Sequence, residues 1–202
     1  MPAPVAQALA AARLWSCPEL FLGPDAPPAR AGLYGWWLDD VPAPVPVAAC
    51  ERDGPWTLLY VGIAPSAPRA HGAPSRATLR SRLRQHTAGN AEGSTLRLTL
   101  GCLLADGLGL ALEARGARGR LGFGAAGEQR LSAWMARHAR VRWVEDAQPW
   151  LLEEQLLRAL DLPLNLDGNE HHPFHGPLSH VRAQARQRAR AGWRAAGGGA
   201  LP

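Results

Sequence analysis

Two apolar segments rich in aromatic and β-branched residues predict neighbouring β-strands. Residues 32–38 read GLYGWWL and residues 56–63 read WTLLYVGI, a composition that is typical of strands. A third strand is predicted over residues 141–145, where side chains of different character alternate along VRWVE. Residues 39–55 contain four prolines and are therefore expected to form a loop or excursion between the first two strands.

Apolar side chains at helical spacing, preceded by capping residues or proline, predict the helices. They cover residues 5–14, about 76–86 with Ser75 as N-cap, a segment capped by Ser94 with leucines up to 104, residues 127–138, a segment from Pro149 that ends at Pro163, and a last basic helix that opens at Pro177. Residues 105–124 are rich in glycine and arginine and are expected to form turns or a small hairpin. This order of elements is typical of a mixed α/β domain around a small sheet.

Neither a disulfide framework nor a membrane segment nor a signal peptide is indicated by the sequence. The three cysteines stand far apart, which argues against paired bridges and against a zinc knuckle. No apolar run approaches the ~20 residues that a transmembrane helix needs, and no basic residue precedes the first apolar stretch. We therefore expect a cytoplasmic protein without a membrane partner, and no pattern specifies its oligomeric state.

Basic charge is concentrated at the C-terminal end of the chain. All 22 basic residues are arginine and the formal net charge is +5, which suits a polyanionic partner. Residues 177–202 hold five arginines and no acidic residue. Four of these arginines recur at every fourth position, namely Arg182, Arg186, Arg190 and Arg194. Such a stripe suits a nucleic-acid backbone, although a solvated end helix in an arginine-rich chain has the same pattern.

The chain has only two tyrosines, and each lies in a predicted strand beside a glycine. If the strands that carry Tyr34 and Tyr60 pair with each other, the two phenols come to the same end of the sheet. A phenol can accept a proton from water when nearby cations lower its pKa. The alternative interpretation is that both are ordinary strand aromatics.

The glycines beside the two tyrosines complete two short motifs. Gly32-Leu33-Tyr34 and Tyr60-Val61-Gly62 resemble the two halves of the signature of the GIY-YIG nuclease superfamily. In that family the two halves are joined by a tight connection, whereas here 25 residues separate the tyrosines. The insertion bears on the substrate more than on the chemistry, because loops on a shared scaffold usually set specificity.

Further residues match the family in order and spacing. The family places an arginine on the next helix, four residues before a frequent histidine, and Arg82 and His86 have that arrangement. It also places a metal-binding glutamate on a later helix, and Glu153 precedes Asn165 by the expected twelve positions. Glu154 is the alternative to Glu153, which we prefer because it fits both this spacing and the apolar residues that follow it.

The resemblance implies a fold and a domain organisation. The fold would be a mixed α+β domain with a small central three-stranded antiparallel sheet flanked by helices. This domain would span residues 31–166, with insertions near 39–55 and 105–140. An N-terminal helix and connector, residues 1–30, would precede it, and a His-containing turn with the basic C-terminal helix, residues 167–202, would follow.

The resemblance also implies a role for each tyrosine and for the histidine. Tyr34 would be the general base or would position the attacking water. Tyr60 would hydrogen-bond the phosphate or the water. His86 lies one helical turn after Arg82 and could share the site as a proton carrier.

The remaining residues of the set would handle charge. Arg82 would stabilise the transition state, which its planar guanidinium suits. Glu153 would bind one divalent metal ion, Mg²⁺ or Mn²⁺, through a carboxylate oxygen. Asn165 would hold the local backbone or the metal shell. Without the other residues of the set, Arg82 and Glu153 would be interpreted as parts of solvated helix faces.

These implications lead to a functional expectation with alternatives. We expect a metal-dependent endonuclease that hydrolyses phosphodiester bonds in double-stranded DNA. The alternatives are a non-catalytic nucleic-acid-binding module on the same fold and a nuclease that cleaves RNA. Three histidines, His171, His172 and His175, could bind zinc, but no cysteine lies near them, and a phosphate-contacting or packing role is favoured.

Overall fold

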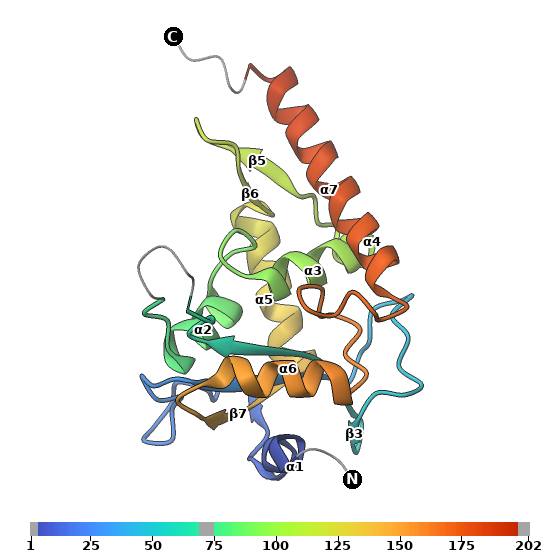
Figure 1. Ribbon diagram of the computed structural model, residues 1–202. Coiled ribbons are helices and arrows are strands. Elements are labelled where there is room, and N and C mark those ends of the chain that lie inside the picture. Colours follow the sequence, from blue (N-terminus) through green and yellow to red (C-terminus); the bar gives the residue numbers. More distant parts are fainter. Residues whose placement is uncertain (1–3, 69–74, 198–202) are drawn as a thin grey trace.

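An antiparallel sheet with strand order β1-β7-β2-β4-β3 forms the base of the molecule in the computed structural model, which describes residues 4–68 and 75–197 (Figure 1). Its strands are β1 (Trp15–Ser16), β2 (Gly32–Leu38), β3 (Arg52–Asp53), β4 (Trp56–Ala64) and β7 (Ala139–Glu145). The three long strands, β2, β4 and β7, are those that the sequence predicts. The expectation of three strands is corrected to five, because β1 and β3 extend the sheet at its edges. Two-residue strands leave no periodic pattern in a sequence.

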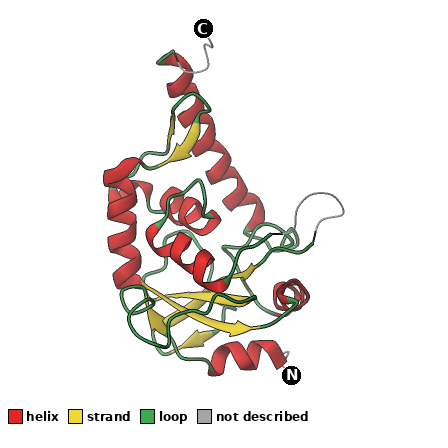
Figure 2. Cartoon of the chain, turned by 90° about the vertical axis from the view of Figure 1, so that its left-hand side faces the viewer, coloured by secondary structure: helices red, strands yellow, loops and turns green. Residues whose placement is uncertain are grey.

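Seven helices and a small hairpin complete the described part of the chain. The helices are α1 (Pro4–Ala11), α2 (Leu79–Ala88), α3 (Thr95–Leu103), α4 (Ala105–Leu108), α5 (Gly124–His138), α6 (Pro149–Ala159) and α7 (His175–Ala195), and the hairpin joins β5 (Glu113–Arg115) to β6 (Arg120–Gly122). The hairpin and the C-terminal half of α7 project together from the body of the molecule (Figure 2). The helix predicted from about residue 76 begins at Leu79, because Thr78 forms a capping box with Ser81.

Each face of the sheet carries its own hydrophobic core. On one face, Tyr34 and Trp36 of β2 pack in a cluster that includes residues of α2, α3 and α5. On the other face, Leu33 and Trp37 pack with α1 and α6. Successive side chains of a strand point to opposite faces, so a single strand contributes to both cores. Among the described residues, no helix has the length and apolar character that crossing a membrane would require.

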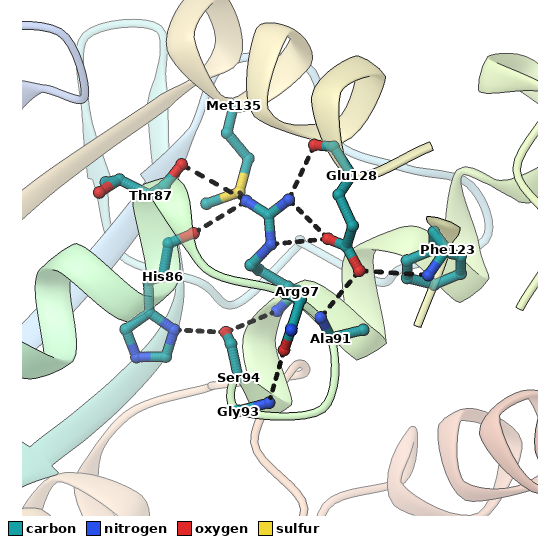
Figure 3. A network of polar contacts seen from close by, with 10 residues as sticks. His86, Thr87, Ala91, Gly93, Ser94, Arg97, Phe123, Glu128 and Met135 are labelled. Atoms are coloured by element: carbon teal, nitrogen blue, oxygen red, sulfur yellow. Dashed lines mark hydrogen bonds and ion pairs between the residues drawn. The ribbon is translucent and has the colours of Figure 1, made fainter. Parts of the chain in front are cut away.

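A buried ion pair joins α2, α3 and α5 (Figure 3). Arg97 of α3 has a fully buried side chain, and its guanidinium donates to the Glu128 carboxylate of α5 through Nε at 3.0 Å and Nη2 at 2.7 Å. The Nη1 group donates to the backbone carbonyl of His86 at 3.2 Å. The second oxygen of Glu128 accepts from the backbone N–H of Ala91 at 2.9 Å. The pair therefore fixes the end of α2 and the loop that follows it.

Candidate active site

The register between β2 and β4 places both tyrosines on one face of the sheet. Tyr34 lies opposite Gly62, and Trp36 lies opposite Tyr60. Gly62 gives the phenol of Tyr34 its space, since a Cβ atom built at this position would stand 2.6 Å from the hydroxyl oxygen. The close approach explains why glycine follows the second tyrosine by two positions.

Gly32, the first motif glycine, is also enclosed. A Cβ atom at Gly32 would stand 2.3 Å from the carbonyl oxygen of Val144 in β7 and 2.7 Å from a methyl group of Leu79 in α2. A backbone oxygen cannot move aside as a flexible side chain can, so any larger residue would displace β2 or β7. This glycine allows α2 to pack closely on the sheet.

A cavity of about 400 Å³ opens beside the two tyrosines. Side chains from four separate elements line it, namely Tyr34 of β2, Tyr60 of β4, Arg82 of α2 and Glu153 of α6, and Asp167 joins them from the loop after α6. Residues that are far apart in the sequence thus reach one enclosed space. Burial raises the pKa of Tyr60 well above its ordinary value, with a further contribution from Tyr34, so its phenol is neutral.

A buried chain of hydrogen bonds holds the Tyr34 hydroxyl. The hydroxyl oxygen lies 2.7 Å from Nε2 of His86, and Nδ1 of the same ring lies 2.6 Å from Oγ of Ser94. Ser94 also caps α3 by accepting from the backbone N–H of Arg97. Burial lowers the pKa of His86 well below its ordinary value, and the charges of Arg82 and Arg97 lower it further. The imidazole is therefore neutral, with one nitrogen available as an acceptor.

Arg82 extends from α2 toward the tyrosines. Its Nη1 group donates to the carbonyl oxygen of Gly93 at 3.1 Å, which orients the guanidinium. Burial raises the pKa of Tyr34, while the charge of Arg82 acts in the opposite direction without cancelling the effect of burial. Tyr34 is therefore a protonated phenol whose oxygen faces a cation, and this cation becomes more important if charge develops on the oxygen.

Glu153 and Asp167 place two carboxylates in the same cavity. Burial, with a smaller contribution from the negative charge of Asp167, raises the pKa of Glu153 to about 7. Such a pair is unfavourable while both groups are ionised, and a divalent cation would offset the repulsion. Carboxylate oxygens are also the ligands that Mg²⁺ and Mn²⁺ prefer. The donor set therefore fits a divalent metal ion. Asp167 could not be predicted from the sequence, because no spacing in the chain connects this exposed loop residue to Glu153.

Asn165 holds strand β4 through two hydrogen bonds to its backbone. Its amide Nδ2 donates to the carbonyl oxygen of Val61 at 2.9 Å, and its Oδ1 accepts from the Val61 N–H at the same distance. These two bonds satisfy the groups of β4 that face away from β2. Asn165 thus bonds to the local backbone, and the loop that follows it carries Asp167 to the cavity.

The histidines that follow this loop are separate from the cavity. His172 is buried, and its Nε2 lies 2.7 Å from Asp161. His171 is exposed and His175 is half-buried. Among residues 4–68 and 75–197, no group of three or more His, Cys, Asp or Glu side chains could hold a metal ion. The packing role expected for this cluster therefore describes His172.

The four arginines of the stripe differ in their exposure to solvent. Arg182 is buried, with only 6% of its surface exposed, while Arg186 is half-buried and both Arg190 and Arg194 are exposed. Burial lowers the pKa of Arg182 and the Arg186 charge adds to this effect, whereas Asp167 and Tyr60 raise it. Arg182 thus faces the interior near the cavity and does not share a solvent face with the other three residues.

Comparison with known protein families identifies the family of this chain. A family model described as the GIY-YIG catalytic domain matches residues 32–184. The chain belongs to the GIY-YIG family. A search of curated proteins and a search of solved structures found no match. The GIY-YIG match begins at the first residue of β2 and extends into α7, so it includes the histidine turn and the buried Arg182. It places the chain in a family of nucleases, which act on nucleic acid and are typically metal-dependent.

Gly62→Ala tests whether activity depends on the position of the Tyr34 phenol, as distinct from the stability of the GIY-YIG fold. The added methyl group would stand 2.6 Å from the Tyr34 hydroxyl oxygen, so the ring must move and its bond to His86 must break. We expect nuclease activity to fall at least ~100-fold and stability to fall by about 1–3 kcal/mol, the usual cost of overpacking. Thermal denaturation and a cleavage assay measure the two effects. Gly107→Ala is the control, since a Cβ atom there contacts nothing within 4 Å. Full activity of Gly62→Ala would contradict this account.

Glu153→Gln should change the pH dependence of stability in the metal-free protein. The pKa of Glu153 rises from 4.5 to about 7 on folding, so between these values the unfolded chain has released a proton that the folded chain retains. The wild type therefore loses stability as the pH rises through this window, by about 2 kcal/mol after allowance for partial exposure. Denaturant titrations in EDTA at pH 5 and pH 8 should show this loss in the wild type and not in Glu153→Gln. Glu154→Gln, which alters an exposed carboxylate paired with Arg158, should behave as the wild type. An equal change in the free energy of unfolding between pH 5 and pH 8 for all three proteins would contradict the raised pKa of Glu153.

Proposed function

We propose that the protein is a metal-dependent endonuclease that hydrolyses phosphodiester bonds in DNA. The observation that carries this proposal is the convergence of Tyr34, Tyr60, Arg82 and Glu153 on one cavity from four elements. Phosphodiester hydrolysis needs an acceptor for the proton of water, a donor for the growing negative charge, and a cation at the phosphate. The cavity offers a candidate for each requirement.

Tyr34 and His86 would handle the proton of the attacking water. The Tyr34 oxygen accepts a hydrogen bond from this water while its own hydroxyl donates to Nε2 of His86, and Nδ1 then donates to Ser94. As the water oxygen bonds to phosphorus and the bond from phosphorus to the leaving oxygen breaks, the water proton would pass to the Tyr34 oxygen and the phenol proton to His86. A neutral imidazole can accept that proton. Burial disfavours the resulting cation, so His86 would return its proton to Tyr34 while Tyr34 releases one to the solvent, from which the leaving oxygen is protonated.

Arg82 and Tyr60 would act on the phosphate. The Arg82 guanidinium lines the cavity and is oriented by its bond to Gly93, and a guanidinium can meet two phosphate oxygens at once. Charge increases on these oxygens in the transition state, so the interaction strengthens there. Tyr60 keeps its proton because burial raises its pKa, which leaves it as a hydrogen-bond donor to the phosphate or the water.

A single divalent metal ion, Mg²⁺ or Mn²⁺, would be held by Glu153, with Asp167 as the nearby second carboxylate. When bound, the ion would neutralise charge on the phosphate and the leaving oxygen. A non-catalytic binding module would have no need for two carboxylates beside a phosphate site, since they repel a polyanion when no cation is present. The Glu153 and Asp167 pair therefore favours catalysis over binding alone.

The decisive experiment is a cleavage assay on plasmid DNA, on branched DNA and on duplex RNA, with and without Mg²⁺ or Mn²⁺. Glu153→Gln should fold and should abolish cleavage, because it removes the charged ligand and preserves the shape of the side chain. Glu154→Gln, one position along on the exposed side of α6, should cleave normally. The opposite pattern would mean that Glu154 is the metal ligand. Wild type that cleaves RNA and leaves DNA intact would overturn the proposed substrate.

Arg82→Ala should lower the rate of cleavage at least ~100-fold, the usual scale for loss of a transition-state donor. Binding of DNA should weaken far less, because the interaction is strongest in the transition state. Single-turnover rates and binding curves in EDTA separate the two quantities. The control is Arg84→Ala on the same helix, an exposed arginine that stacks on Phe21. An Arg82→Ala protein with a wild-type rate and poor binding would make Arg82 a docking residue.

A further inference from the structure

The β5–β6 hairpin and α7 lie beside each other at the end of the molecule away from the five-stranded sheet (Figures 1 and 2). A groove lined by arginines lies between them. It has a volume of about 400 Å³. Arg118 and Arg120 line it from the hairpin, and Arg186 and Arg190 line it from α7. The two pairs come from segments that are more than sixty residues apart in the sequence, so folding is what gathers these four charges.

The walls of the groove are fixed to each other. The indole Nε1 of Trp193 in α7 donates to the carbonyl oxygen of Gly116 at 3.1 Å, and its ring lies against Gly119 in the turn of the hairpin. On the same face of α7 as Trp193, Leu178 and Ala189 are buried. The arginines therefore project from a held backbone, and binding there would order only their side chains.

The charges of the groove are largely uncompensated. Its one carboxylate, Glu92, lies 3.6 Å from Arg120 in an exposed ion pair, and such pairs contribute little. Among the described residues, no carboxylate pairs with Arg118, Arg186 or Arg190. Like charges that converge without counter-charges repel each other, and an anion in the groove would relieve this repulsion.

We propose that this arginine groove binds the sugar-phosphate backbone of the nucleic-acid substrate, outside the catalytic cavity. The inference rests on the proposed function for the kind of substrate, and it names a second contact surface for it. Arg182, which is buried, is not part of the groove. The contacts would position the substrate without reading its sequence, because phosphates carry no base identity.

The extent of the charge favours a chain of phosphates over a single phosphate. Arg186 and Arg190 stand ~6 Å apart along the helix axis, and the exposed Arg194 follows one turn later on the same stripe. A single phosphate group is compact and cannot follow charges that extend along several turns of a helix. A nucleic-acid strand offers a line of phosphates that can engage all of these arginines at once.

Helix α7 connects the groove to the catalytic cavity. Its first turns pack in the core cluster that contains Tyr34, through the buried Leu178, and Arg190 follows Leu178 by ~18 Å along the helix axis. One turn of duplex DNA spans about 34 Å. A duplex at the cavity is therefore long enough to reach the groove as well.

The test is binding of a labelled 20-base-pair DNA duplex to the full chain in EDTA, where no cleavage is expected, at several salt concentrations. One variant replaces the hairpin pair, Arg118→Gln and Arg120→Gln, a second replaces the helix pair, Arg186→Gln and Arg190→Gln, and a third combines all four. The combined variant should bind at least ~10-fold more weakly. The slope of log affinity against log salt should flatten by about 2 to 4, since each phosphate contact contributes ~0.9. Each double variant alone should give about half of that change. If the combined variant does not fold, the two double variants decide the test.

Controls and probes separate the possible outcomes. Arg137→Gln, an exposed arginine near the end of α5, should leave both affinity and slope unchanged. Substitution is preferred to truncation because removal of α7 would uncover the core around Leu178. Equal affinity and equal slope for the wild type and all groove variants would overturn the proposal. Polyglutamate is the probe for an acidic protein partner. A groove variant that keeps its affinity for duplex DNA and loses affinity for polyglutamate would also overturn the proposal. Loss of duplex binding by the variants would support the groove even if the wild type cleaved nothing, so failure of the proposed function is seen separately.

Discussion

The pairing of β2 with β4 is the constraint on which the candidate active site depends. Its register sets Tyr34 opposite Gly62, and the missing side chain of Gly62 leaves room for the phenol. Side chains of a strand alternate between faces, so a slip of one residue would turn the tyrosines toward the opposite core. The insertion at residues 39–55 leaves the pairing of Tyr34 with Gly62 in place, because the chain leaves the sheet after β2 and its end returns only at the outer edge, as β3 beside β4. A long excursion can therefore be added to the family fold without moving the two phenols.

The buried Arg97 provides a second constraint, on the face of the sheet that carries Tyr34. A buried guanidinium is stable only when its donors are satisfied, and here they are shared between Glu128 and the end of α2. The same helix carries Arg82 and His86, one turn apart. Because α2 is fixed at its end by Arg97, the imidazole that bonds to Tyr34 and the guanidinium that faces it keep one relative position. The polar core thus orients the candidate site without contacting the substrate.

What could be predicted from the sequence follows from which features leave a local pattern. The long strands and the helix that carries Glu153 have such patterns, and the structure contains them. Asp167 and the β1 and β3 pairings could not be predicted, because each depends on where the folded chain brings an otherwise ordinary residue. The bonds of Asn165 to the backbone of Val61 likewise join two residues that no local pattern connects.

The arginines of α7 illustrate the same limit in geometric terms. Residues four apart on an α-helix differ by about 40° around its axis, because a turn holds 3.6 residues. A stripe of four such residues therefore turns through about 120° from first to last. Arg182 begins on the face that carries the buried Leu178, and by Arg190 the stripe has rotated into solvent. Equal spacing in the sequence thus gives unequal environments, so the first arginine belongs to the interior beside the cavity, and the later ones are free to face the hairpin and its two arginines. The basic surface is consequently built by two segments across a groove, which a pattern within one helix cannot reveal.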